Sequence, residues 1–192
     1  WCINQNNVFA TNSVRMPEQT AQEIWSDRRA VVTNGPPTRS VTAVPVDGGY
    51  RLSGRWNFSS GIRHATWVAA LVPISHPDQG DDALTDRKEV RTLLMPKKDV
   101  NLVDVWQVNG LRGTGSFSFE ADDLFVPGYR SYGPSDGPRE GGALYVIPTG
   151  LLFPSGFAMV ALGVARASLD AAIDFAGSKT VHQETLRDKA TT

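Results

Sequence analysis

The organisation predicted for the chain is clearest in residues 48–61, which read Gly48-Gly49-Tyr50-Arg51-Leu52-Ser53-Gly54-Arg55-Trp56-Asn57-Phe58-Ser59-Ser60-Gly61. This stretch begins as a β-hairpin. Asp47-Gly48-Gly49 supplies the positive-φ positions of a tight turn, and it joins two alternating runs, Val41–Val44 and Tyr50–Ser53. The sequence therefore predicts two antiparallel strands here.

The end of the same stretch has a different composition. Trp56 and Phe58 stand two residues apart, so they are expected to share one face of an extended chain. Ser59, Ser60 and Gly61 follow at once. A flat apolar wall beside hydroxyls and backbone amides suits a planar ring with polar edges. An ordinary core strand that runs into a Ser-rich turn explains the same residues.

The bulk composition is that of a globular protein. The 192 residues are 41% hydrophobic and 20% charged, with a formal net charge of −1 and scattered Lys and Arg, so no nucleic-acid partner is expected. The single Cys2 fits a reducing compartment, and we expect a cytoplasmic protein. The three histidines are dispersed, so no metal site is expected. The sequence holds no uninterrupted apolar run long enough to span a membrane, so no membrane partner is expected.

The two ends predict a fragment of a longer protein. The chain opens on Trp1-Cys2-Ile3 without an initiator Met or a signal peptide, and it closes on residues 187–192 without a stop signal. A Thr-rich polar tail is the competing explanation for the C-terminal end.

Residues 1–29 are predicted to close an N-terminal helical domain, with one helix opening at Pro17 and ending near Arg29. Residues 30–130 form a β domain. Short runs at this spacing predict an antiparallel barrel or sandwich flanked by helices, an α+β fold. The predicted strands are 30–33, 39–45, 50–58, 66–72, 90–95, 100–108 and 116–126.

Two loops invite a ligand interpretation. Ser75–Glu89 holds four aspartates, but their spacing lacks the regular ligands and closing Glu of a calcium loop. Gly110–Ser116 holds three glycines, but a strand follows them instead of the helix that a dinucleotide loop requires. We expect the second loop to be a tight strand connection that approaches a ligand.

Residues 131–192 are predicted to be a linker and the truncated start of a C-terminal helical bundle. The Gly- and Pro-rich segment Pro127–Gly142 precedes a long helix, Phe153–Lys179. Between residues 157 and 176 this helix carries charge only at Arg166, Asp170 and Asp174, on one thin stripe. A helix that is apolar over most of its circumference is buried in a bundle or an oligomer interface.

Three motifs together resemble the acyl-CoA dehydrogenase superfamily, and most closely its flavin-dependent monooxygenases, the oxygenase components of two-component hydroxylases. The motifs are Gly49–Gly61 with His64–Trp67 just after it, Gly110–Ser116 running on to Ala121–Pro127, and Ala161–Arg166. The first two are specific in combination, and the third is weak. In that family a β-barrel lies between two helical domains and together they hold a flavin.

Departures from the dehydrogenase pattern favour the monooxygenase branch. Dehydrogenases usually carry a Thr-Glu-Pro-type run with Gly-Ser-Asp before the hairpin, where this chain has residues 32–37, Val-Thr-Asn-Gly-Pro-Pro. Their hairpin usually leads to a Trp-Ile-Thr-Asn-type run, where this chain has Phe58-Ser59-Ser60-Gly61.

The resemblance implies a function that starts from reduced flavin, FADH2 or FMNH2, supplied by a separate flavin reductase. The protein would hydroxylate a small, aromatic substrate through a C4a-hydroperoxyflavin and would form a homo-oligomer, a tetramer. Phe58 would lie against the flavin ring, and Ser59 or Ser60 would bond near its N5 and O4 atoms. Thr33 matches a flavin-contacting threonine loosely, and Lys179 falls near a phosphate-binding Arg; a solvated lysine explains Lys179 as well.

The residues alone identify no catalytic nucleophile, acid or base. An acyl-CoA dehydrogenase, with tightly held FAD, remains the alternative enzyme. A non-catalytic β domain with an interaction helix, which would bind no flavin, is the third hypothesis. This stretch of chain by itself is expected to be inactive.

Overall fold

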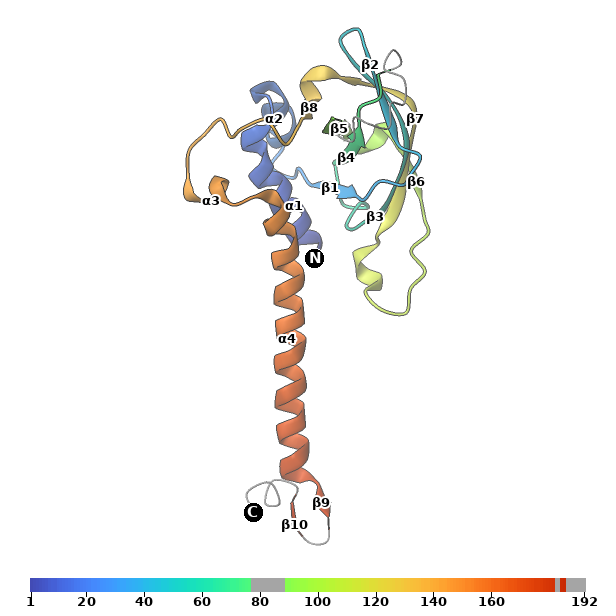
Figure 1. The fold of residues 1–192 in the computed structure, drawn as a ribbon. Coiled ribbons are helices and arrows are strands. Elements are labelled where there is room, and N and C mark those ends of the chain that lie inside the picture. The colour runs from blue at the N-terminus through green and yellow to red at the C-terminus, as the bar shows by residue number, and fades with distance from the viewer. Residues whose placement is uncertain (77–88, 182–183, 186–192) are drawn as a thin grey trace, which may run out of the picture. The chain divides into compact units, whose positions relative to one another are not determined.

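The computed structural model describes residues 1–76, 89–181 and 184–185, and these divide into two compact units, 1–149 and 150–192 (Figure 1). The four aspartates of the predicted acidic loop, Asp78, Asp81, Asp82 and Asp86, lie outside the described residues. Each unit is described separately below.

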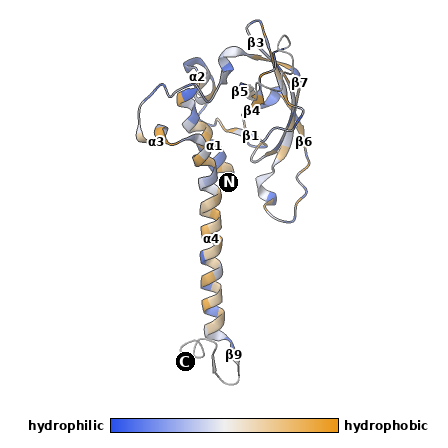
Figure 2. Ribbon diagram, viewed as in Figure 1, coloured by the Kyte–Doolittle hydropathy of each residue, from blue (hydrophilic) through white to orange (hydrophobic). Residues whose placement is uncertain are grey.

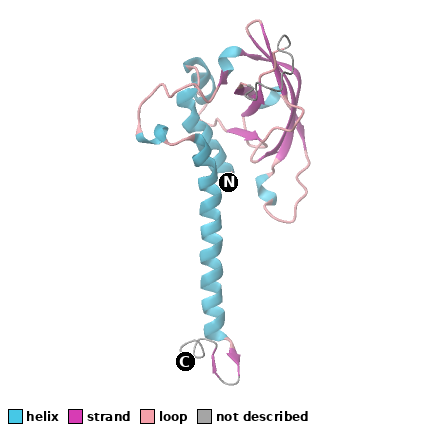
Figure 3. Ribbon diagram, viewed as in Figure 1, coloured by secondary structure: helices cyan, strands magenta, loops and turns pink. Residues whose placement is uncertain are grey.

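Two four-stranded sheets form the body of the first unit (Figure 3). Antiparallel pairing joins all neighbouring strands except β1 and β4, which run parallel. The predicted α+β fold with an antiparallel β domain is confirmed. One sheet has the order β1 (Val32–Gly35), β4 (Trp67–Pro73), β5 (Val90–Pro96) and β8 (Ser131–Tyr132); the other has β2 (Thr42–Val46), β3 (Gly49–Ser59), β7 (Phe117–Pro127) and β6 (Asn101–Val103).

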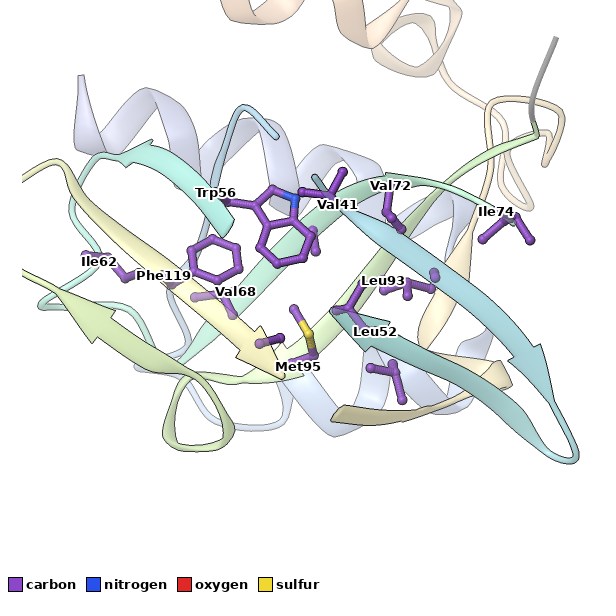
Figure 4. Close-up of a cluster of buried hydrophobic side chains, with 14 of the residues drawn as sticks. Val41, Leu52, Trp56, Ile62, Val68, Val72, Ile74, Leu93, Met95 and Phe119 are labelled. Carbon is purple, nitrogen blue, oxygen red and sulfur yellow. The ribbon is translucent and has the colours of Figure 1, made fainter. Parts of the chain in front are cut away.

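The hydrophobic core draws on both sheets (Figure 4). Trp56 of β3 is fully buried, and its ring stacks on Phe119 of β7 with 5.0 Å between the centroids. The indole Nε1 donates a hydrogen bond to the carbonyl of Leu71, 3.0 Å away on β4 of the other sheet. The Trp56 side chain thus packs within its own sheet and also bonds to the other sheet.

The predicted hairpin is confirmed. Strand β2 pairs with β3 from Val46 opposite Gly49 to Thr42 opposite Ser53, and Gly48 in the turn has φ +75°. A glycine adopts this left-handed conformation without steric cost, which is why the turn forms at this point.

The prediction that Trp56 and Phe58 share a face is wrong. The pairing of β3 with β7 shifts register between Trp56 and Ser59, and Phe58 has φ +53°. This irregularity rotates the chain, so Trp56 is buried whereas Phe58 is 59% exposed. The alternation of side chains between the two faces of a strand is interrupted at a bulge.

Two helices precede the sheets. Helix α1 spans Cys2–Asn12, and α2 spans Glu18–Trp25. The second ends before the predicted Arg29. Asn6 of α1 accepts a 3.0 Å hydrogen bond from the backbone N–H of Val32, which attaches this helix to the start of β1.

Two connections differ from their predictions. The strand expected over 100–108 ends at Val103, where β6 stops pairing with β7. Residues 104–116 therefore form a long loop with a single 3₁₀ turn, Arg112–Thr114, in place of a tight connection. Within the segment expected to be a linker, β8 pairs with β5 through Thr92–Tyr132 and Leu93–Ser131, and a short helix, α3 (Ala143–Val146), follows it.

The second unit contains α4 (Thr149–Ser178) and a small antiparallel pair, β9 (Thr180–Val181) with β10 (Glu184–Thr185). The helix begins earlier than predicted and includes Pro154. Its surface is largely apolar (Figure 2), none of its described side chains is buried, and Arg166 pairs with Asp170. By length and composition this helix is able to cross a membrane, a criterion that buried helices of soluble proteins also meet.

Candidate functional site

A pocket of about 210 Å³ lies in the first unit, between α1, β1 and the turn that follows β3. Its wall is mostly apolar, with few polar groups. Thr33 and Ser60, two of the residues predicted to bind a cofactor, both line it. The remaining wall comes from Cys2, Ile3, Asn6, Val31, Val32, Gly61 and His64.

The end of β3 folds into this wall through a sharp change of direction. After Phe58, the N–H of Ser60 donates to the Phe58 carbonyl at 2.8 Å, and Gly61 has φ +79°. The Gly61 N–H then donates to the carbonyl of Thr114 at 2.7 Å. These bonds hold the two serines against the loop 104–116, although the loop is remote from them in sequence.

Close approach of β1 to the end of β3 requires a glycine. A Cβ atom on Gly35 would lie 2.0 Å from the Asn57 carbonyl oxygen and 2.5 Å from Ser59 Oγ. Because Gly35 has no side chain, the two backbones pack directly, which brings neighbouring Thr33 to Ser60. The hydroxyl of Thr33 is buried and donates a 2.7 Å hydrogen bond to the Ser60 carbonyl.

The two adjacent serines have different environments. Ser59 is completely buried, and its Oγ has no hydrogen-bond partner among the residues that the structure describes. Ser60 lines the pocket, and its Oγ lies 2.8 Å from Ser116 Oγ. Of the two, Ser60 is the one placed to meet a ligand in this pocket.

Ser116 continues the contact into a row of hydroxyls. Its Oγ lies 2.7 Å from Thr114 Oγ1, which in turn donates to the carbonyl of Leu111 at 3.0 Å. The sequence marked this loop only as one that approaches a ligand and did not single out Ser116 or Thr114. Ser60 and Ser116 are 56 residues apart, so no local spacing predicts their contact.

Phe58 presents an exposed aromatic face in the neighbouring segment. Its ring contacts Trp106 of the loop edge-to-face, with 6.1 Å between centroids and 89° between planes. The Trp106 Nε1 donates to the Leu111 carbonyl at 3.2 Å. The loop therefore holds both the aromatic pair and the row of hydroxyls, since Leu111 accepts a bond from each.

Lys179 belongs to the second unit, whereas the other four predicted residues belong to the first. Its Nζ lies 4.9 Å from the Phe175 ring centroid. Thr33, Ser59 and Ser60 are brought together by β1 and the end of β3, and Phe58 directly precedes them. Among the described residues, no three metal-ligating side chains gather in a cluster.

These groups fit one edge of a flavin ring. Its heteroatoms need hydrogen-bonding partners, and its faces need an apolar neighbour such as the exposed ring of Phe58. A hydroxyl on the pocket wall beside an aromatic side chain supplies both. Cys2 and His64 also line the pocket, and the Cys2 thiol donates to the Thr114 carbonyl, 3.8 Å away.

Two similar solved structures define the fold. The 3-HSA hydroxylase from Rhodococcus sp. RHA1 superposes with a TM-score of 0.77 at 24% identity, over 95% of this chain and 48% of that one. The HsaA monooxygenase from M. tuberculosis gives a TM-score of 0.60 at 30% identity, over 69% of this chain and 35% of that one. The chain has the acyl-CoA dehydrogenase-like fold of these hydroxylase oxygenases.

Proteins related in sequence indicate the class of enzyme within this fold. The oxygenase subunit HsaA of a flavin-dependent monooxygenase from Mycobacterium tuberculosis is 29% identical over 170 residues, which is 84% of this chain and 41% of that protein. The oxygenase component of the FADH(2)-dependent resorcinol hydroxylase from Rhizobium sp. (strain MTP-10005) is 32% identical over 174 residues, or 85% and 41%. No family model matches the chain.

The chain is thus homologous to the oxygenase components of flavin-dependent monooxygenases, as the sequence motifs predicted. It spans about two fifths of the length of these relatives.

Proposed function

We propose that the whole protein is the oxygenase component of a two-component flavin-dependent monooxygenase that hydroxylates a small aromatic compound. One observation carries this proposal: the chain's homology to such components runs through the residues that build the pocket and the aromatic face, Thr33, Phe58 and Ser60 among them. The relatives' names support the substrate class, since one acts on resorcinol and another on p-hydroxyphenylacetate.

Each residue has a distinct task in this proposal. Phe58 provides an apolar face for the flavin ring and keeps water from that side. Ser60 bonds the N5 edge, and Thr33 holds the Ser60 carbonyl in place. Ser59 is enclosed against Gly35 and supports the turn without touching the ligand. The role of Lys179 at the flavin phosphates stays a prediction from the sequence resemblance, since a single lysine can serve there as a point charge.

Reduced flavin, FADH2 or FMNH2, would supply the electrons and the activated oxygen for the reaction. The protein's proposed contribution is to bind the ring, orient it and exclude water. A separate flavin reductase is the proposed source of reduced flavin, and related oxygenase components support this partner. We further propose a cytoplasmic location and a homotetramer.

The test is a reaction of the whole protein with chemically reduced FAD or FMN, oxygen and a panel of phenols. The expected result is a hydroxylated phenol that carries one oxygen atom from labelled O2. A reaction without phenol controls for uncoupled oxidation of the flavin. Reduced flavin that is oxidised without any labelled product would contradict the proposal. Bleaching of bound oxidised FAD by an acyl-CoA would identify a dehydrogenase instead.

A further inference from the structure

The bulge near the end of β3 gives the left-handed backbone conformation to an unexpected residue. Strand β3 has two residues, Asn57 and Phe58, where β7 has only Ser118. Phe58 is the one that leaves the regular strand geometry, with φ +53°. Asparagine adopts this conformation far more readily than a bulky aromatic residue does. The surroundings of Asn57 must therefore hold it in the strand.

A polar network holds the Asn57 side chain. The Ser118 hydroxyl donates to Asn57 Oδ1 at 2.8 Å, and Arg55 Nε donates to the same oxygen at 3.2 Å. Arg55 also donates from Nη2 to Ser118 Oγ at 3.3 Å and from Nη1 to Glu120 Oε1 at 3.2 Å. A guanidinium only donates and a carbonyl or carboxylate oxygen only accepts, so every bond in this network has one direction.

The network is built on regular strands. Ser118 is fully buried, and on the other side of β7 it pairs with Val103 of β6. Arg55 lies directly opposite Glu120 in the pairing of β3 with β7, so its charge is balanced across the two strands. Because water does not reach the Ser118 hydroxyl, the bond from Ser118 to Asn57 has no solvent competitor.

The backbone of Asn57 is held as well. Its N–H donates to the Pro36 carbonyl at 3.1 Å, and the preceding Arg55 carbonyl accepts the N–H of Thr38 at 3.0 Å. The Asn57 carbonyl packs against Gly35, where a Cβ atom would lie only 2.0 Å from the oxygen. Rotation of Asn57 into the left-handed region would disrupt these contacts together with the side-chain network.

We infer that Asn57 is a positioning residue whose network makes Phe58 take the left-handed conformation and so directs the Phe58 ring to the flavin. This inference rests on the proposed function. If Asn57 left the strand instead, Phe58 would become the residue opposite Ser118, and directly opposed side chains share a face of the sheet. The ring would then lie against Ser118 and lose its edge-to-face contact with Trp106.

The first measurement needs no flavin. The difference in near-ultraviolet circular dichroism between the whole wild-type protein and its Phe58→Ala variant gives the signature of the contact between Phe58 and Trp106. Asn57→Gly removes the oxygen at the centre of the network and places at this position a residue that adopts positive φ without steric cost. We expect Asn57→Gly to lose the same signature.

The second measurement is the affinity of the whole protein for reduced FAD and reduced FMN under anaerobic conditions. Asn57→Gly should weaken binding about tenfold, the fold-change that corresponds to one unfavourable left-handed residue. Ser118→Ala removes one of the hydrogen bonds to Asn57 and should weaken binding about threefold. Asn57→Asp keeps an oxygen for Ser118 and Arg55, so it should retain the wild-type affinity.

Ser131→Ala is the matched control. Ser131 is buried on β8, accepts a 3.2 Å bond from Arg91 Nε and donates to the Gly128 carbonyl at 2.8 Å. It therefore links an arginine to a carbonyl oxygen as Ser118 does, but in the other sheet. Ser131→Ala should lower thermal stability as Ser118→Ala does and leave flavin affinity unchanged.

A double-mutant cycle shows whether Asn57 acts through Phe58. In the Phe58→Ala background no ring remains to be positioned, so Asn57→Gly should hardly change the affinity for reduced flavin. A general loss of structure would weaken binding by the same factor in both backgrounds. Thermal unfolding of each variant confirms that it is folded.

The outcomes are distinguishable. If the wild-type protein binds reduced flavin and Asn57→Gly keeps both the affinity and the aromatic signature, the inference is wrong although the protein remains a flavoprotein. Equal weakening by Asn57→Gly in the wild-type and Phe58→Ala backgrounds would also overturn it. If the wild-type protein binds neither reduced FAD nor reduced FMN, the proposed function is wrong, and the inference is overturned with it.

Discussion

At the scale of single residues, Phe58 combines a strained backbone with an exposed ring. Its φ of +53° places a bulky side chain in the left-handed region, which costs about 1–2 kcal/mol. An exposed phenylalanine recovers little of that cost by burial, and its contact with Trp106 offsets only part. Strain of this kind concentrates where function requires a particular direction of a side chain.

The first prediction follows from that strain. Phe58→Gly relieves the left-handed conformation, whereas Phe58→Ala keeps the Cβ atom and loses only the ring. The glycine variant should therefore be about 1 kcal/mol more stable than the alanine variant, the reverse of their usual order. Both should bind flavin at least about tenfold more weakly, since each lacks the aromatic face.

Urea unfolding measures the first effect and fluorescence titration with reduced flavin measures the second. An alanine variant more stable than the glycine variant would show that the backbone at residue 58 is unstrained.

At the scale of elements, β3 connects the two sheets through Trp56. The ring stacks on Phe119 of the adjacent strand, while Nε1 donates to Leu71 on β4 of the other sheet. Strand β3 therefore serves three purposes: its start forms the hairpin, its middle fills the core, and its end builds the pocket. A substitution that disturbs the middle of β3 should therefore also affect the pocket at the end of the strand.

The second prediction separates the two contributions of Trp56 to stability. Trp56→Phe keeps an aromatic ring beside Phe119 but loses the hydrogen bond, and it should lower the free energy of unfolding by about 1–2 kcal/mol. Trp56→Ala also leaves a cavity and should lower it by about 3–5 kcal/mol. Denaturant titration measures both, and equal losses would mean that ring packing contributes little here.

Strand β8 carries a buried hydroxyl that titrates at high pH. Burial raises the pKa of Tyr132 to about 12, although hydrogen bonds with Thr92 and Asn12 and the charge of Arg15 act in the opposite direction. The unfolded chain releases the same proton near pH 10. The folded state therefore retains a proton that the unfolded state has lost between these two values.

The third prediction is a loss of stability in that window. The contribution of Tyr132 is fully present below about pH 10 and is lost as the pH rises towards about 12, a decrease of up to about 2.7 kcal/mol. Tyr132→Phe removes this ionisation, so its unfolding free energy should depend less on pH over the same range. Denaturant titrations at about pH 9.5 and about pH 11.5 compare the two proteins. Parallel pH profiles would exclude Tyr132 as the source.

At the scale of the whole molecule, the chain divides into two units that differ in how their apolar side chains are covered. The first, residues 1–149, has its own core between the sheets. The second is dominated by a 30-residue helix whose large apolar side chains, including Leu162 and Leu169, are exposed within the described chain. A helix that is apolar on nearly all sides is stable in water only when other helices cover it.

The fourth prediction tests the proposed homotetramer. Leu162 and Leu169 are seven residues apart and so lie on one face of α4. Replacing both with glutamate should shift the whole protein from tetramer towards smaller species in sedimentation velocity, because buried unpaired charge opposes association. Asp174→Asn, on the charged stripe, should leave the sedimentation coefficient unchanged. A wild-type protein that sediments as a monomer would contradict the proposed assembly.

Patterns within a few residues were predictable. The hairpin at residues 46–49, the buried strand Trp67–Pro73 and the long helix follow from turn chemistry and hydrophobic periodicity, which act locally. The motifs also identified the class of relatives that the comparisons then found. The opposite faces of Trp56 and Phe58 were not predictable, because the bulge depends on how β3 pairs with β7.

The sequence by itself determined most of the strands of the first unit, the fold class and the presence of hydroxyls after an aromatic pair. Only the tertiary structure decided that Ser60 lines the pocket while Ser59 is enclosed, and that the hydroxyl of Ser60 meets Ser116, which in turn meets Thr114. The physical reason is that a hydrogen bond depends on distance and direction between atoms, and these partners are far apart along the chain. Their contact exists only after β3 and β7 have paired.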